Sequence, residues 1–486
     1  MRVLVTGATG YVGGRLVPRL LAAGHNLVCL ARKPGRLAGR GWGDFEVREG
    51  DVLDRSSLDS AFSGIDAAYY LVHSMAEGER GFEKRDRIAA KNFGAAAREA
   101  GVQRIIYLGG LGVDNKDLSS HLASRQQVGD LLRSSGVPVT EFRAAIVVGS
   151  GSISFEMIRY LTERLPVMIT PRWVTTRSQP IAIQNVLDYL TDCLAIPESA
   201  GRIFEIGGPD VLTYGDMMRE YAAARQLRRF LIAVPVLTPR LSSYWVDLVT
   251  PIPASYSQPL IEGLKSEAIV NDLSARDVFD ITLIPYAEAV RRALERTRTG
   301  DTETYWAGAQ SPRSEGVSTR EVQGVIVEER RVASTASAQA VFDAFSGIGG
   351  DRGWLYADAL WKIRGLMDRL IGGVGMRRGR RNADKLRAGD ALDFWRVEAV
   401  EAGRVVRLRA EMKVPGSAML EFEARARPEG GSMLIQTASF DPRGLAGLIY
   451  WYALYPIHQT IFSGMAKAIV ACAESMPAQA PRSPII

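Results

Sequence analysis

The N-terminal stretch Met1-Arg-Val-Leu-Val-Thr-Gly-Ala-Thr-Gly-Tyr-Val-Gly13 decides the fold of the first half of the chain. It starts with a short apolar strand, Val3–Val5, and continues with three regularly spaced glycines, Gly7, Gly10 and Gly13. Glycines allow a tight strand-to-helix turn whose backbone approaches a pyrophosphate, and the helix N-terminus stabilises the phosphate charge. Such a triplet between a buried strand and a helix is a specific signal. It predicts a dinucleotide-binding site, with a glycine-rich turn of another α/β protein as the alternative.

The end of the second predicted strand indicates which dinucleotide binds. Leu27–Ala31 is followed by Arg32 and Lys33 rather than by Asp or Glu. An acidic residue at this point would hydrogen-bond the ribose hydroxyls of NAD, whereas cations attract a 2′-phosphate. The pair therefore favours NADP(H) over NAD(H). A solvated strand end is the alternative.

The composition limits the class of protein. The 486 residues suggest two or three domains, and the net charge of +6 is spread along the chain, so nucleic acid is not an expected partner. Three scattered cysteines and four histidines predict no metal site and favour a reducing cytoplasm. The chain enters a strand at once, so we expect no secretory signal.

One nearly uncharged stretch, Gly444–Ala473, is long enough to span a membrane and contains a single charged residue, Lys467. Pro456, His458 and Gln459 interrupt it. We therefore interpret it as a buried or cavity-lining helix. Peripheral membrane contact remains the alternative, which makes the expected location cytoplasmic, with membrane association left open.

Alternating strands and helices up to about Arg202 predict an α/β fold, a doubly wound parallel sheet covered on both faces. The later strands are predicted at Val47–Val52, Ala67–Val72, Arg104–Leu108, Val139–Arg143 and Arg202–Ile206. From about 207 to 298, prolines break helical pieces into a smaller substrate lobe. Residues 1–298 thus form one predicted domain, and the polar segment 299–318 is a linker.

The segment 319–476 is predicted as a second, α+β domain, followed by a tail at 477–486. Its strands are predicted at Gly324–Val332, Ala391–Val397, Arg404–Ala410, Ala418–Ala424 and Ser432–Thr437, with a helix at Ser337–Phe345. The long apolar helix closes the domain. In this order a curved sheet wraps a helix and leaves an apolar cavity.

The motif Thr6–Gly13, with Arg32, Asp51 and the rhythm of elements to about residue 298, resembles the atypical or extended short-chain dehydrogenase/reductases near the NmrA-like and epimerase-like branch. The later segment resembles an uncharacterised domain often fused to such proteins, similar to the START/polyketide-cyclase helix-grip fold. Its marks are Gly349-Gly350, Gly353-Trp354, Leu360–Gly365, Gly372-Gly373, Arg377–Arg381, Phe394–Val397 and Glu411–Gly416.

The expected catalytic residues depart from this family's pattern, which is a Tyr-x-x-x-Lys pair with an upstream Ser. The matching helix has His121 and Arg125, whose i, i+4 spacing places both on one helical face. Gly109-Gly110 stands where the Ser is expected. Histidine titrates near neutrality, so His121 is a candidate proton donor, and Arg125 can grip a ribose hydroxyl. His121 as a helix-surface residue without a role is the alternative.

The resemblance implies a set of cofactor contacts: Thr6, Gly7, Thr9, Gly10, Tyr11, Val12, Gly13, Arg32, Lys33, Asp51, Val52, Leu71, His73 and Arg125. Asp51 is expected to contact the edge of the adenine. His73 and Ser74 follow the fourth predicted strand, where they either line the rim of the nicotinamide site or belong to a loop without a role in binding. Arg143 is a weaker candidate for the substrate pocket. Asn92 reads as a helix-packing residue, and the basic run 377–387 as a solvated loop or a site for an anionic headgroup or phosphate.

Two functions follow from these features. The first is an NADP(H)-dependent oxidoreductase acting on an apolar small molecule, such as an isoprenoid, quinone, lipid or polyketide, that the second domain supplies or shields. The alternative is a non-catalytic NADP(H)-binding redox sensor or assembly factor. A sugar-nucleotide epimerase or dehydratase is disfavoured, because those reactions need the missing Tyr and Ser. No sequence feature indicates an oligomeric state.

Overall fold

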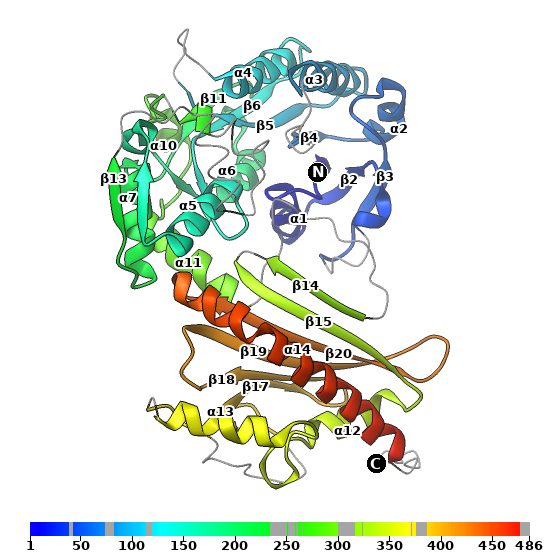
Figure 1. Cartoon of the computed structure of the whole chain (residues 1–486). Helices are drawn as coiled ribbons and strands as arrows, with labels where there is room; N and C mark the ends of the chain where they lie inside the picture. The colour runs from blue at the N-terminus through cyan, green and yellow to red at the C-terminus, as the bar shows by residue number, and fades with distance from the viewer. Residues whose placement is uncertain are drawn as a thin grey trace. The chain divides into compact units, whose positions relative to one another are not determined.

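The chain divides into two compact units, Met1–Gln310 and Ser311–Ile486, which are described separately (Figure 1). The computed structural model describes residues 1–37, 42–72, 82–112, 119–233, 250, 258, 261–264, 266–299, 316–322, 324–370, 372–375 and 386–476. Most of the predicted linker 299–318 and the whole predicted tail 477–486 lie outside these residues.

Seven parallel strands form the sheet of the first unit, in the order β11-β6-β5-β4-β1-β2-β3 (Figure 1). Their bounds are β1 Arg2–Thr6, β2 Asn26–Ala31, β3 Glu46–Glu49, β4 Ala67–Tyr70, β5 Arg104–Gly110, β6 Val139–Ala144 and β11 Ile203–Ile206. The strand order reverses at β1, between β4 and β2. In sheets of this kind the ligand binds at that reversal, outside the carboxyl ends of the strands.

Helices cover both faces of this sheet, as the continuous apolar strands require. Within β1, Val3 and Val5 belong to a core shared with α1 and α6, whereas Leu4 belongs to the opposite core shared with α2, α3 and α4. These helices are α1 Gly13–Ala22, α2 Leu58–Phe62, α3 Phe82–Glu99, α4 Ser120–Arg133 and α6 Ile183–Asp192. The predicted doubly wound α/β fold is confirmed.

A smaller lobe has its own core, to which α5 (Ile153–Arg164), α7 (Tyr214–Ala224) and α11 (Tyr286–Thr299) contribute. Strand β8 (Val167–Thr170) pairs in parallel with β13 (Phe230–Ala233). The lobe thus includes residues well before 207, where the sequence placed its start, because α5 packs on α7 instead of on the large sheet. The short elements are β7 Val147–Val148, β9 Arg177–Ser178, β10 Ile181–Ala182, β12 Leu212–Thr213 and α10 Ser274–Val278.

The second unit is a seven-stranded antiparallel sheet in the order β14-β15-β20-β19-β18-β17-β16. Its elements are β14 Gly316–Val322, β15 Val325–Ser334, α12 Ala338–Ser346, α13 Asp358–Leu370, β16 Ala391–Leu392, β17 Trp395–Glu401, β18 Val405–Ala410, β19 Gly416–Ala426, β20 Ser432–Pro442 and α14 Gly444–Ser475. Strand β14 begins inside the last residues of the predicted linker. The helix-grip likeness of this unit stays a prediction.

The predicted strand Ala391–Val397 is instead a hairpin of β16 and β17. Asp393 in the turn has a φ of 54°, a left-handed conformation that Asp tolerates better than most residues. Its carboxylate accepts a hydrogen bond from the Trp354 indole at 2.9 Å. This long-range contact fixes the turn, and no local pattern reveals it.

Helix α14 has two different halves. Its second half packs into the main core of the unit, with Ile461, Phe462, Met465, Ala466, Ile469, Val470 and Ala473. Its first half buries Trp451 in a separate small core while Ile449 and Tyr452 are exposed. The predicted buried helix is therefore confirmed for the second half only. Among the described helices, none combines the length and apolarity that crossing a bilayer requires.

Candidate functional site

The glycine-rich turn after β1 has no room for side chains. Gly7 has a φ of 74°, and a Cβ atom built on it would lie 2.4 Å from the Leu71 carbonyl oxygen. A Cβ on Gly13 would lie 2.3 Å from the Gly7 carbonyl oxygen. Both positions therefore require glycine, because any side chain there would press against the chain's own backbone.

The turn joins two strand ends to a helix start. The Thr6 hydroxyl donates to the Tyr69 carbonyl at 2.8 Å and accepts from the Leu71 amide at 3.2 Å, which ties β1 to β4. Helix α1 begins at Gly13 without a side-chain cap, and its first turn carries no acidic residue. The Gly14 and Arg15 amides already donate to the Gly10 and Val12 carbonyls, both at 3.1 Å, so an anion would lie at the amides that precede Gly14 and at the positive end of the helix. The turn between Gly7 and Gly13 contains the other predicted cofactor contacts, Thr9, Gly10, Tyr11 and Val12.

Arg32 and Lys33 follow β2 directly, and both are exposed. Because β2 neighbours β1, the two cations lie on the strand end next to the glycine-rich turn. No carboxylate follows β2 before Pro34. The pair lies at the end of β2, and its binding of a 2′-phosphate stays a prediction.

The loop after β3 carries the predicted adenine contacts, Asp51 and Val52. The Asp51 carboxylate accepts from the Leu53 amide at 3.0 Å and so shapes the loop itself. Asn92 of α3 donates to the carbonyls of Val52 and Leu53, both at 3.1 Å. Asn92 therefore holds this loop against α3, a more specific contact than the helix packing that the sequence suggested.

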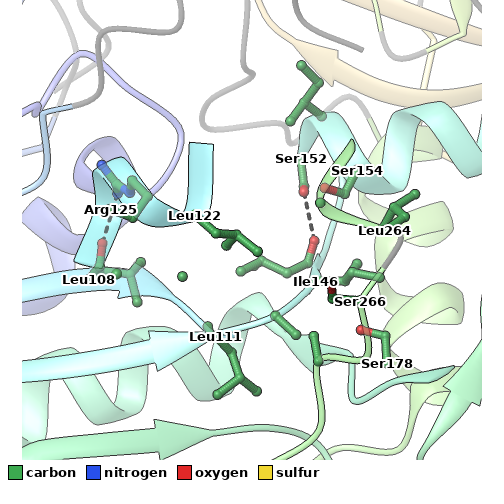
Figure 2. Close-up of a pocket in the computed structure, with 18 of the residues that line it drawn as sticks. Leu108, Leu111, Leu122, Arg125, Ile146, Ser152, Ser154, Ser178, Leu264 and Ser266 are labelled. Atoms are coloured by element: carbon green, nitrogen blue, oxygen red, sulfur yellow. Dashed lines mark hydrogen bonds between the residues drawn. The ribbon is translucent and has the colours of Figure 1, made fainter. Parts of the chain in front are cut away.

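A pocket of about 300 Å³ lies at the carboxyl ends of β5 and β6. Tyr11 and Val12 of the glycine-rich turn form part of its wall. Figure 2 shows Arg125 and Leu122 of α4 on one side and the serine hydroxyls on the other. Its apolar lining includes Leu108, Leu111, Leu122, Ala144, Ala145, Ile146, Val147, Ile153 and Leu264. The pocket suits a largely apolar molecule.

Arg125 is held at the pocket wall by backbone oxygen atoms. Its Nη2 donates to the Leu108 carbonyl at 2.9 Å (Figure 2). Its guanidinium lies over the Tyr107 ring, 5.4 Å from the ring centroid. Burial raises the pKa of Tyr107 to about 12, so the phenol stays protonated and donates to the Arg125 carbonyl at 2.8 Å. Arg125 is therefore rigidly placed, with further N–H groups available for a ligand.

The other predicted catalytic features are only partly described. His121 lies in the first turn of α4, but its side chain is outside the described residues, as are His73 and Ser74. Gly110 lines the pocket, and a Cβ on it would lie 2.8 Å from Leu122 Cδ2. Leu122 thus occupies the space beside the position where a serine was expected.

Sequence reasoning missed the hydroxyl groups on the far side of the pocket. Ser152 donates to the Val147 carbonyl at 2.7 Å. Ser178 of β9 is only 5% exposed and lines the pocket, and its hydroxyl has no hydrogen-bond partner among the residues that the structure describes. Ser178 is far along the chain from the glycine-rich turn, so no local pattern could have indicated it.

Arg143 was predicted near the substrate pocket, and the structure places it elsewhere. Its Nε forms an ion pair with Glu141 at 2.7 Å, and Arg133 binds the other oxygen of the same carboxylate. Glu141 is almost fully buried, so it needs both cations for charge compensation. Ala144 and Ala145 line the pocket in its place.

Of the basic run 377–387, only Leu386 and Arg387 belong to the described residues.

Within the described part of the chain, no cluster of three or more His, Cys, Asp or Glu side chains is arranged to hold a metal ion.

Comparison with known families finds a match for each unit. Residues 7–153 match a family described as NAD(P)H-binding. Residues 323–465 match a family described as a protein of unknown function, DUF2867.

Individual relatives match part of the chain. The (4-alkanoyl-5-oxo-2,5-dihydrofuran-3-yl)methyl phosphate reductase of Streptomyces griseus is 32% identical over 275 residues, which cover 55% of this chain and 86% of that protein. The divinyl chlorophyllide a 8-vinyl-reductase of Oryza sativa is 27% identical over 220 residues, 43% of this chain and 54% of that protein. The 3 beta-hydroxysteroid dehydrogenase/Delta 5-->4-isomerase of Mycobacterium tuberculosis is 36% identical over 115 residues, 22% of this chain and 30% of that protein.

Among solved structures, the triphenylmethane reductase of Citrobacter sp. is similar in fold. It is 19% identical with a TM-score of 0.50, and the match covers 61% of this chain and all of that one.

Proposed function

Because the chain belongs to the NAD(P)H-binding reductases with a Rossmann fold of the atypical short-chain dehydrogenase/reductase type, we propose that it reduces an apolar small molecule with NADPH. The observation that carries the proposal is the position of the pocket. Tyr11 and Val12 belong both to the glycine-rich turn and to the pocket wall. A cofactor bound at the turn would therefore have its reactive end beside a mainly apolar volume of about 300 Å³.

The residues present fit a dinucleotide. Gly7 and Gly13 leave no space for a side chain, and the amides that precede Gly14, at the positive end of α1, would bind a pyrophosphate. Arg32 and Lys33 would bind a 2′-phosphate, which is the reason to prefer NADP(H) over NAD(H). When bound, the nicotinamide supplies a hydride; the chain's own residues bind and orient both reactants.

We propose a lipophilic enone or related carbonyl compound as the substrate. The apolar lining supports a substrate with a hydrocarbon body, and two of the relatives are named as reductases. For an enone, the hydride and a proton add across the carbon–carbon double bond, which gives a saturated ketone and NADP⁺. The Ser178 hydroxyl would donate to the carbonyl oxygen, where negative charge develops during hydride addition.

His121 and Arg125 take the places of the family's Tyr and Lys in this proposal. His121 would donate the proton, because imidazole titrates near neutral pH. Arg125, which already donates to the Leu108 carbonyl, would use its remaining N–H groups to orient the nicotinamide ribose.

The test is NADPH oxidation, followed at 340 nm, with a panel of cyclic enones and quinones. We expect saturable turnover with at least one of them. His121→Ala should lower kcat markedly, and Ser178→Ala should lower it by about 100-fold, the effect of losing one donor to a developing oxyanion. Ser178→Ala should leave the melting temperature unchanged, because the hydroxyl has no partner among the described residues to lose.

His25→Ala is the matched control, since His25 lies after α1 and does not line the pocket; its kcat should equal that of the wild type. Unchanged turnover in His121→Ala would remove His121 from the mechanism. Tight NADPH binding without turnover of any compound in the panel would contradict the reductase and favour the sensor or assembly factor.

A further inference from the structure

Helix α13, on the periphery of the second unit, turns most of its apolar side chains outward (Figure 1). Its inner side carries Trp361, Gly365 and Asp368, which are buried, and Trp361 belongs to the main core of the unit. A surface helix of a soluble domain normally packs its apolar side against the core. Here the outer side carries five large apolar side chains, each between 44% and 79% exposed: Leu360, Ile363, Leu366, Met367 and Leu370.

Hydrogen bonds at both ends of α13 hold the helix in this orientation. The Asp368 carboxylate, which is buried, accepts from the Lys413 amide at 2.7 Å and from the Gly375 amide at 2.9 Å. At the start of the helix, Asp358 Oδ1 accepts from the Trp354 amide at 2.7 Å. Turning the apolar side inward would remove Asp368 from both of its donors, and a buried amide without a partner is unfavourable. The fold therefore keeps the apolar side exposed.

The five exposed side chains form one continuous strip, which we call the apolar strip of α13. Their spacing of three and four residues places them within an arc of about 120° on the helix. Exposed apolar surfaces of this kind, bordered by polar residues, are typical of sites that bind another protein or a membrane.

Cations border the apolar strip on both sides. By their helical positions, Lys362 and Arg369 lie along one edge and Arg364 along the other. Within the described part of the chain, no carboxylate forms an ion pair with any of the three. In the sequence, residues 371–387 then add six Lys or Arg residues and one acidic residue. An apolar strip between cations complements an anionic bilayer, in which phosphate groups lie above hydrocarbon.

A second copy of this chain fits the same surface less well. In a symmetric dimer a surface meets itself, so the cations around the strip would face those of the other copy. Like charges that face each other across an interface repel. The charge around the strip thus favours an anionic partner over a second copy.

We propose that α13 lies on the surface of a membrane that contains anionic phospholipids. The apolar strip enters the boundary between headgroups and acyl chains, and Lys362, Arg364 and Arg369 contact lipid phosphates. The 13 residues of α13 extend over about 20 Å, which is less than the hydrocarbon thickness of about 30 Å, so the helix lies on the bilayer without crossing it. This surface is separate from the pocket of the first unit and does not depend on the proposed reductase activity.

The test is sedimentation of the full-length protein with lipid vesicles. Vesicles of phosphatidylcholine with about one quarter phosphatidylglycerol are compared with vesicles of phosphatidylcholine alone. We expect saturable binding to the anionic vesicles and at least tenfold weaker binding to the neutral ones. Raising the NaCl concentration from about 0.1 M to about 0.5 M should weaken binding at least fivefold, because salt screens the attraction between cations and phosphates.

Two double variants of α13 separate the two parts of the surface. I363Q/L370Q removes two side chains of the apolar strip, and K362E/R369E reverses two of the charges beside it. Each should bind the anionic vesicles at least tenfold more weakly than the wild type. All four side chains are exposed, so both variants should keep the wild-type melting temperature.

The matched controls make the same kinds of change in the first unit. I88Q/L273Q replaces two apolar side chains that are 40% and 51% exposed. K91E/R98E reverses two exposed cations of α3 and changes the net charge as much as the charge-reversing variant of α13 does. Both controls should bind the anionic vesicles as the wild type does.

Three results with vesicles would overturn the proposal: no binding to anionic vesicles, equally tight binding to neutral ones, or the same loss of binding in a control as in the matching variant of α13. Light scattering without vesicles gives a further check. A dimer that I363Q/L370Q converts into a monomer would assign the apolar strip to a second copy of the chain and would also overturn the proposal.

Discussion

Arg32 is the first of two exposed cations that follow β2, and we expect it to select the cofactor. Arg32→Glu replaces an attraction to the 2′-phosphate with a repulsion and offers a carboxylate to the ribose hydroxyls of NADH. The dissociation constant for NADPH should therefore rise at least tenfold, while that for NADH stays the same or falls. Calorimetric titration with both cofactors measures the two changes.

Lys91→Glu makes the same kind of charge change at an exposed position of α3. It should leave the ratio of the two dissociation constants as it is in the wild type. An equal loss of NADPH and NADH affinity in Arg32→Glu would contradict selection by the 2′-phosphate.

His458 should make the second unit sensitive to acid. Burial is the main cause that lowers its pKa from 6.5 to about 4. Between these values the unfolded chain binds a proton that the folded chain does not, so stability falls as the pH falls from 6.5 to about 4. The full loss is about 3 kcal/mol. Above pH 6.5 His458 is neutral in both states, so its titration no longer changes the stability.

His458→Phe keeps the ring contacts with Trp451 and Phe462 and removes the titration. Urea unfolding at pH 7 and pH 5 should show a smaller drop in stability for this variant than for the wild type. An equal drop in both proteins would show that other groups cause the acid sensitivity.

At the scale of an element, the turn between β1 and α1 depends on Gly7. Gly7→Ala places a methyl group 2.4 Å from a backbone oxygen and strains a φ of 74°. We expect loss of NADPH binding together with lower stability. Gly24→Ala is the matched control, because Gly24 has a φ of 81° but open space around it.

Gly24→Ala should cost about 1 kcal/mol from backbone strain alone and keep wild-type NADPH affinity. Thermal unfolding and cofactor titration separate the two effects. Full NADPH affinity in Gly7→Ala would contradict the role of the turn.

The strands of both sheets were largely predictable from the sequence, because buried parallel strands form apolar runs and half-buried antiparallel strands alternate. The contacts between elements and between distant side chains were not predictable. The apolar face of α5 does not reveal that it packs on α7, and Arg143 carries no local sign of its ion pair with Glu141. Ser178 reaches the pocket through a two-residue strand whose position only the folded lobe determines.

At the scale of the whole molecule, the two units have separate cores. We therefore expect two calorimetric unfolding transitions. NADPH at 100 times its dissociation constant should stabilise the first unit by about 2.7 kcal/mol and raise only one of the two melting temperatures.

Arg32→Glu identifies the transition of the first unit, since the shift by NADPH should shrink in this variant. One single transition that NADPH moves as a whole would show that the units unfold together.

Met1–Gln310 and Ser311–Ile486 belong to one polypeptide, and this fixes the relative amounts in which a cell makes the two units. Ribosomes make the two units in equal number, so neither can be in excess over the other. If one unit released a compound that the other binds, its local concentration would be set by the covalent connection and not by dilution into the cell. Expression as two unlinked proteins would remove that advantage without altering either fold.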